Sequence, residues 1–169
     1  FADEVSPMLD QIVAEGRPTY LRLGAGPNTP DGAQTYGSFR HVVRSQSPIG
    51  TVVALGPVTA NVLTALQDKL LTDQFDVFTA TNLPLDLPAD LAHKWAGKPM
   101  LVVEEHVSVG GLAQQLSVKL LADGAAPSHF VSLSAQGYPN GLYGDQKYHQ
   151  QLSGLDPVNI ARQLASFTN

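Results

Sequence analysis

The sequence predicts an α/β fold in which a mostly parallel sheet carries helices on both faces, giving three layers. Short continuous apolar runs alternate with segments of helical periodicity, which is the pattern of parallel strands buried on both faces. A length of 169 residues, 43% of them hydrophobic, suits one globular domain with its own core. Only 15% of the residues are charged, which argues against a disordered or coiled-coil chain.

The first 23 residues predict a helix followed by a strand. Ser6 and Pro7 suit the start of a helix, because serine caps free N–H groups and proline is tolerated in the first turn. Gly16 suits its end. Residues 18–23 alternate as a half-buried strand does. The helix would carry one apolar stripe, formed by Met8, Leu9, Ile12 and Val13.

Residues 24–47 predict a linker, because glycine and proline accumulate early in this segment and apolar periodicity is absent. Such a length is unusual for a connection inside a compact domain. We therefore expect the autonomous fold to begin near residue 48. The chain begins with Phe1 instead of Met, and we expect a fragment of a longer protein.

The rest of the chain predicts strands that alternate with helices. Proline-rich residues 83–88 cannot be helical throughout and predict a loop. The predicted strands are residues 51–55, 75–80, 99–103 and 130–133. The predicted helices carry Val58, Val62, Leu66 and Leu70; then Leu112, Leu116 and Leu120 after a start near Gly110; and finally Val158, Ile160, Ala161 and Leu164 after Asp156-Pro157.

Composition excludes several classes of protein. No cysteine is present, which excludes disulfides, thiolate zinc ligands and a cysteine nucleophile and favours a reducing compartment, so we expect the cytoplasm. A net charge of −5 gives no electrostatic footprint for nucleic acid or for an anionic membrane. No apolar run reaches the ~18 residues that span a bilayer, and the N-terminus lacks the regions of a signal peptide. We expect neither nucleic acid nor a membrane as a partner.

Loops that follow strand carboxyl ends are the expected functional positions in such sheets, which here are Gly56, Thr81-Asn82 and residues 104–111. The last is richest in ionisable side chains. Glu104, Glu105 and His106 are suited to proton transfer, with Glu105 predicted on one face of the strand and the other two on the opposite face. Alternatively, they bond neighbouring loops or a partner subunit, and Gly110-Gly111 only allow close helix packing.

Other chemistries have weaker signatures. Gly110-Gly111 before a helix offer N–H groups to an anion, but no GxGxxG motif is present. Ser108 lies in a strand-turn-helix context suited to a hydrolase nucleophile, with His129 or His149 and Asp123 or Asp145 as partners, although the preceding glycine is absent. The histidines lack metal-ligand spacing. Basic residues gather around the predicted linker, namely Arg17, Arg22, Arg40, His41 and Arg44. They would suit a phosphorylated ligand or an acidic protein surface. Alternatively, they are only solvated surface residues.

Residues 50–66 and 99–112 resemble the C-terminal domain of transketolase-like, thiamine-diphosphate-dependent enzymes. This group includes transketolase, deoxyxylulose phosphate synthase and the β subunits of 2-oxo acid dehydrogenases. The shared features are a strand ending in glycine, a helix with spaced alanines, a Leu-Pro-Leu-Asp-like segment at residues 83–86, then Glu-Glu-His and Gly-Gly. Residues 141–144 and 149–156 resemble the family's closing pattern of a glycine-rich loop, a short helix, Gly-Leu-Asp and a last helix.

The resemblance implies a five-stranded mixed sheet with one antiparallel edge strand. It makes residues 1–23 the tail of a preceding pyrimidine-binding domain, 24–47 a linker and 48–169 the C-terminal-like domain. In the family, thiamine diphosphate and Mg²⁺ lie between pyrophosphate- and pyrimidine-binding domains of a dimer, and the Gly-Asp-Gly element that binds the metal is missing here, since Gly144-Asp145 is followed by Gln146. We therefore expect no catalytic, cofactor or metal residue in this chain.

The expected function is thus that of a C-terminal domain of an enzyme of two-carbon ketol transfer, serving assembly, dimerisation or regulation. The upstream domains would be its partners. The expected interface or active-site mouth consists of Glu104, Glu105, His106, Gly110 and Gly111. A β-subunit fragment of a 2-oxo acid dehydrogenase and a stand-alone protein-interaction module remain alternatives.

Overall fold

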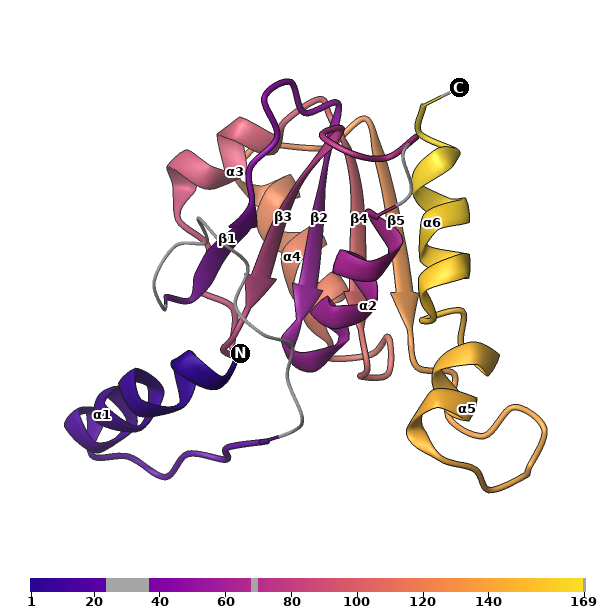
Figure 1. Cartoon of the computed structure of the whole chain (residues 1–169). Coiled ribbons are helices and arrows are strands. Elements are labelled where there is room, and N and C mark those ends of the chain that lie inside the picture. Colours follow the sequence, from indigo (N-terminus) through magenta and orange to yellow (C-terminus); the bar gives the residue numbers. More distant parts are fainter. Residues whose placement is uncertain (24–36, 68–69, 169) are drawn as a thin grey trace.

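The computed structural model describes residues 1–23, 37–67 and 70–168 (Figure 1). A five-stranded sheet with the order β1-β3-β2-β4-β5 forms its centre. Strand β1 pairs antiparallel with β3, and the other three pairs are parallel. The mixed sheet with one antiparallel edge strand is therefore confirmed. The strands are β1 (Phe39–Val43), β2 (Gly50–Leu55), β3 (Phe75–Ala80), β4 (Pro99–Glu104) and β5 (His129–Ser134).

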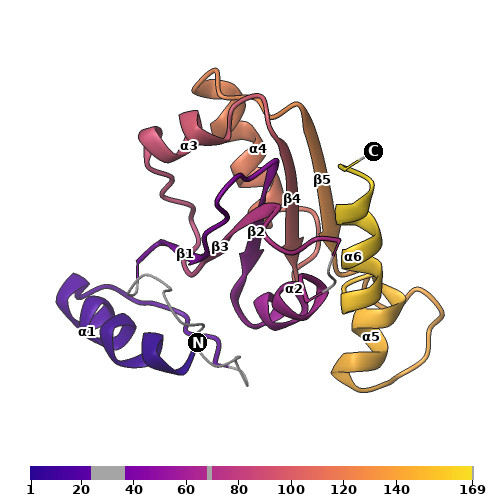
Figure 2. The ribbon, with the colours of Figure 1, turned by 45° about the horizontal axis from the view of Figure 1, so that its top comes forward.

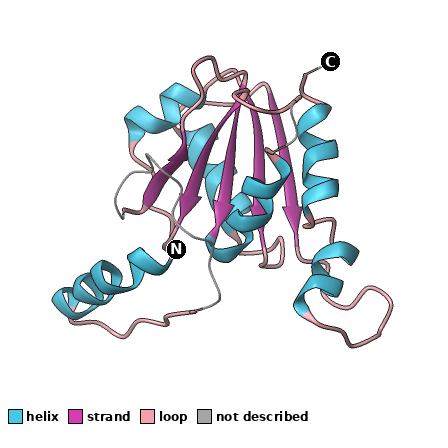
Figure 3. Cartoon of the chain, viewed as in Figure 1, coloured by secondary structure: helices cyan, strands magenta, loops and turns pink. Residues whose placement is uncertain are grey.

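Helices cover both faces of the sheet, which confirms the three layers (Figure 3). The helices α2 (Thr59–Ala65) and α6 (Pro157–Ala165) pack on one face. On the other face lie α3 (Ala89–Trp95) and α4 (Leu112–Ala122). The remaining helices are α1 (Val5–Glu15), α5 (Gln146–Leu152) and the 3₁₀ turns Ala2–Glu4 and Gly56–Val58.

Side-chain pattern explains the central strands. Val52 and Ala54 point into the core with α2 and α6, whereas Val53 points into the core with α3 and α4. Every residue of β2 except Leu55 is buried, because both faces of this strand are covered. A continuous apolar run is the expected sequence of such a strand.

Three predicted elements differ from the structure. Residues 18–23 are not a strand but an exposed coil. Residues 39–43, part of the predicted linker 24–47, form β1, while residues 24–36 lie outside the described part of the chain. Helix α2 ends at Ala65, so Leu70 of the expected apolar face lies in a turn and is 75% exposed.

Helix α1 stands away from the rest of the molecule, as two views show (Figures 1 and 2). It contains no buried residue. Of the predicted stripe, Leu9 is 44% exposed and Val13 is 78% exposed. Among the described residues, this apolar face therefore has no partner that buries it. An 11-residue helix has little stability of its own in water, so such a face is expected to need one.

Candidate functional site

The carboxyl ends of β2 and β4 form the switch point of the sheet. After β2 the chain passes through α2 to β3, and after β4 it passes through α4 to β5, in the opposite direction and on the opposite face. Gly56 and residues 104–111 therefore lie on the two sides of this point. Ligands of open α/β sheets bind in such crevices.

Glu104 caps helix α4 from within the core. Its side chain is fully buried, and its two carboxylate oxygens accept hydrogen bonds from the backbone N–H groups of Leu112 (2.7 Å) and Ala113 (3.0 Å). A Cβ atom on Gly111 would lie 2.3 Å from Glu104 Oε2, so only glycine fits between them. The carboxylate thus occupies the place at the helix N-terminus that an anionic ligand would take.

Glu105 faces α5 instead. Its side chain is 10% exposed, and the Nε2 groups of Gln146 and Gln150 donate to its carboxylate. Arg22 Nη2 lies 3.5 Å from Glu105 Oε2. His106 is exposed, and its Nδ1 lies 2.9 Å from the carbonyl oxygen of Val107. The structure therefore gives Glu104, Glu105 and His106 separate partners and does not assemble them into one proton-transfer site.

Gly110 makes the turn that leads into α4. Its φ of +78° lies in the left-handed region, which favours glycine. The Gln114 side chain accepts a hydrogen bond from the Gly110 N–H, and Gln115 donates to the Gly110 carbonyl. The two glycines thus serve helix packing and the turn.

A cavity of about 560 Å³, here called the β4–α5 cavity, lies beside Glu105. Sequence reasoning missed Gln146 and Gln150, which line the cavity, and Asn61, which donates to the Gln150 side chain. The i, i+4 spacing of the two glutamines was a signal, but nothing in the sequence showed that they face Glu105. The cavity is lined by Arg22, Leu23, Pro57, Glu105, Ala135, Gly137, Tyr138, Gln146, His149, Gln150, Ser153 and Leu155.

Ser108 does not meet a catalytic partner. It is exposed, and Asp145 is engaged as the N-cap of α5, where it accepts from the N–H of Tyr148 (2.8 Å). His129 begins β5, at the end of the sheet opposite to the loop of Ser108. Within residues 1–23, 37–67 and 70–168, no group of three or more metal-ligating side chains gathers. In the same residues, no helix is long and apolar enough to cross a bilayer.

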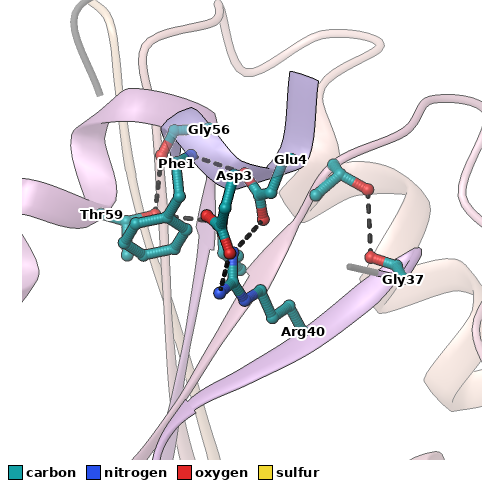
Figure 4. Close-up of polar contacts among 9 residues, drawn as sticks. Phe1, Asp3, Glu4, Gly37, Arg40, Gly56 and Thr59 are labelled. Atoms are coloured by element: carbon teal, nitrogen blue, oxygen red, sulfur yellow. Dashed lines mark hydrogen bonds and ion pairs between the residues drawn. The ribbon is translucent and has the colours of Figure 1, made fainter. Parts of the chain in front are cut away.

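Arg40 joins the N-terminal segment to the sheet edge (Figure 4). Its side chain is 1% exposed, with Nη2 2.7 Å from Asp3 and Nη1 3.2 Å from Glu4. The Phe1 ring lies over the guanidinium at 4.7 Å. Burial lowers the pKa of Arg40, but hydrogen bonds to Asp3 and Glu4 outweigh it and raise that pKa above its ordinary value.

The basic residues do not form one ligand site. Arg17 pairs with Glu15, Arg22 with Glu105, and Arg40 with Asp3 and Glu4. His41 Nε2 lies 3.3 Å from Asp76 and its ring stacks on Phe78 at 4.1 Å. Arg44 lines a second cavity, of about 490 Å³, between β1 and α3.

His41 gives the fold a dependence on pH. Burial lowers the pKa of His41, Arg44 lowers it further, and Asp76 only partly offsets them. As the pH falls, His41 of the unfolded chain therefore takes up a proton near pH ~6.5, and His41 of the folded chain does so only at lower pH. The contribution of neutral His41 to the free energy of unfolding is therefore fully present above this pH. It is lost as the pH falls from the pKa of His41 in the unfolded chain to its pKa in the folded chain.

We expect the free energy of unfolding by urea to fall between about pH 7.5 and about pH 5.5. In His41→Gln this part of the fall should disappear, because the titrating group is gone. His129→Gln, at an exposed position, is the matched control and should keep the wild-type slope. An unchanged slope in His41→Gln would contradict the assignment.

No protein-family model and no curated protein sequence matches the chain. Solved structures do match. The split-gene transketolase in its inactive β4 tetramer shares 18% identity with a TM-score of 0.61, over 84% of this chain and 46% of that chain. The transketolase from Leishmania mexicana shares 15% identity with a TM-score of 0.55, over 77% of this chain and 18% of that one.

A third neighbour is the transketolase from Campylobacter jejuni, with 12% identity and a TM-score of 0.53, over 86% of this chain and 20% of that one. The chain thus spans less than half the length of these transketolases. At these identities the matches show the fold alone. The chain has a transketolase-like α/β fold of the C-terminal-domain type.

Proposed function

We propose that this chain is the C-terminal domain, or a fragment containing it, of a transketolase-like enzyme that transfers two-carbon ketol units. The observation that carries the proposal is the fold match with a split-gene transketolase over 84% of this chain but only 46% of that one. The role of the chain would be assembly with upstream pyrophosphate- and pyrimidine-binding domains, within a homodimer. The lack of cysteine supports a reducing compartment such as the cytoplasm.

Thiamine diphosphate and Mg²⁺ would be held by those partner domains. The residues at the switch point do not fit a diphosphate, because Glu104 already accepts from the N–H groups of Leu112 and Ala113. An added anion would also meet the buried charge of this carboxylate. We therefore assign no catalytic step to these residues.

Two exposed apolar surfaces support a role in assembly. Helix α1 presents Leu9 and Val13, and the loop after β4 presents Val107 (50% exposed) and Val109 (76%). Apolar side chains grouped in this way mark contact sites more often than isolated ones do. The loop of Glu104, Glu105, His106, Gly110 and Gly111 would then lie at a domain interface or at the active-site mouth.

Co-expression tests the proposal. The chain is produced with the two cofactor-binding domains of a split transketolase, and we expect them to purify together and to show ketol transfer. Val13→Glu should weaken this association, because it places a charge on the apolar face of α1. Val118→Glu is the matched control on α4, where Val118 is 63% exposed, and it should leave the association unchanged.

Calorimetry of the chain alone should show no binding of thiamine diphosphate in the presence of Mg²⁺. Micromolar binding would overturn the proposal, and so would failure to associate with any cofactor-binding domains. Association with the remainder of a 2-oxo acid dehydrogenase would favour the β-subunit alternative. If the chain folds on its own and binds an unrelated protein, and no ketol transfer is seen, the result would favour a stand-alone interaction module.

A further inference from the structure

The β4–α5 cavity lies where an α/β sheet is expected to bind a ligand. Pro57 follows β2, Glu105 follows β4 and Ala135 follows β5, so the cavity opens outside the carboxyl ends of these three strands. Its volume of about 560 Å³ falls within the range of small-molecule sites. We propose that it binds a neutral polyhydroxylated molecule of about monosaccharide size. The inference does not rest on the proposed function.

The polar wall of this cavity is held in one arrangement. Glu105 accepts from both Gln146 and Gln150, and the side-chain Oε1 of Gln150 accepts from Asn61 Nδ2 at 3.0 Å. Asn61 Nδ2 also donates to the Leu155 carbonyl at 2.8 Å. The chain of amides therefore runs from α2 through α5 to the end of β4. Such fixed groups lose little freedom when a ligand arrives, which favours binding.

His149 lines the same cavity and supports its aromatic wall. Its Nδ1 is buried and has no hydrogen-bond partner within the described residues. The His149 ring packs in T-shaped pairs with Tyr138 and Tyr148, with ring centroids 5.0 Å and 5.3 Å apart. Because Nδ1 has almost no accessible surface, a ligand in the cavity would contact the ring and not this nitrogen, and the ring holds Tyr138 beside the cavity.

The charges select a neutral ligand. The carboxylate of Glu105 and the guanidinium of Arg22 lie 3.5 Å apart and largely cancel, while the other polar side chains that line the cavity are amides, hydroxyls and an imidazole. A charged ligand would lose part of its hydration on entering the cavity without finding an unpaired opposite charge there. Hydroxyl groups both donate and accept, which matches this mixture, and Tyr138, 63% exposed, offers aromatic surface to the C–H groups of a sugar.

An NMR titration of the full chain with xylitol tests the proposal. We expect saturable amide shifts at residues that line the cavity, with a millimolar dissociation constant. In His149→Gln this constant should rise about tenfold, because the ring that lines the cavity and holds Tyr138 is lost. His129→Gln, at the far end of β5, is the matched control and should bind as the wild type does. Gln146→Ala, an exposed substitution on α5, should also weaken binding and keeps the test valid if His149→Gln does not fold.

Three results would overturn the proposal. The first is an absence of saturable shifts with xylitol. The second is xylitol binding that neither His149→Gln nor Gln146→Ala weakens. The third is tighter binding of inorganic phosphate or of ethylammonium than of xylitol, because either would show that the cavity selects charge. If the chain fails to associate with cofactor-binding domains, the proposed function is wrong but this inference still stands. The two proposals can therefore fail separately.

Discussion

Gly111→Ala is expected to lower the free energy of unfolding by about 3 kcal/mol. The new Cβ would lie 2.3 Å from Glu104 Oε2 and 2.7 Å from its Cδ, so the carboxylate must leave its place. Two buried N–H groups, of Leu112 and Ala113, would then lose a charged acceptor. Urea unfolding followed by circular dichroism measures the effect.

The neighbouring glycine provides the control. Around Gly110 a Cβ meets open space, and the only cost of Gly110→Ala is the positive φ of +78°, about 1 kcal/mol. Glu104→Ala removes the group that clashes with a Cβ at position 111. The double variant Glu104→Ala/Gly111→Ala should therefore be more stable than the sum of the two single effects predicts. Additive effects would contradict the proposed clash.

Arg40→Met is expected to destabilise the fold by about 3 kcal/mol, because Asp3 loses its guanidinium partner and the buried carboxylate of Glu4 keeps only the Phe1 ammonium. Asp3 is 49% exposed at its side chain and loses less. Residues 1–15 should also be cut faster by protease, since Arg40 joins them to β1. Urea unfolding and limited proteolysis measure the two effects.

A second substitution separates loss of the ion pair from loss of packing. In Arg40→Met/Glu4→Gln the buried carboxylate charge is gone, and the new amide oxygen can still accept from the Phe1 ammonium, so part of the stability should return. Arg40→Lys keeps the charge but loses the two-pronged contact with Asp3, and we expect an intermediate result. The ion-pair explanation fails if the double variant is as unstable as Arg40→Met.

The central strands were predictable from sequence because both of their faces are covered, so that almost every side chain is apolar. Strand β1 was not. Its buried positions are Arg40 and Val42, and a buried arginine gives no apolar signal when its partners Asp3 and Glu4 lie far away in the chain. Residues 18–23 show the reverse error, since alternation alone does not make a strand without a neighbouring strand, and β1 already pairs with β3 at that edge of the sheet.

The location of the candidate site was predictable, but its contacts were not. Strand order placed Glu104 and Glu105 at a carboxyl end, and alternation placed them on opposite faces. That Glu104 reaches the first turn of α4 depends on how closely this helix packs, which the glycine pair only suggested. That Glu105 meets Gln146 and Gln150 depends on the position of α5, more than 40 residues away.

The carboxylate of Glu104 has a consequence for how this fold responds to its surroundings. A helix N-terminus that binds a free anion gains stability in proportion to the logarithm of ligand concentration. Here the anion is part of the chain, at a fixed effective concentration, so the helix stays capped whether metabolite levels rise or fall. The first turn of α4 is therefore insulated from phosphate in solution, and any response of the domain to small molecules must arise elsewhere.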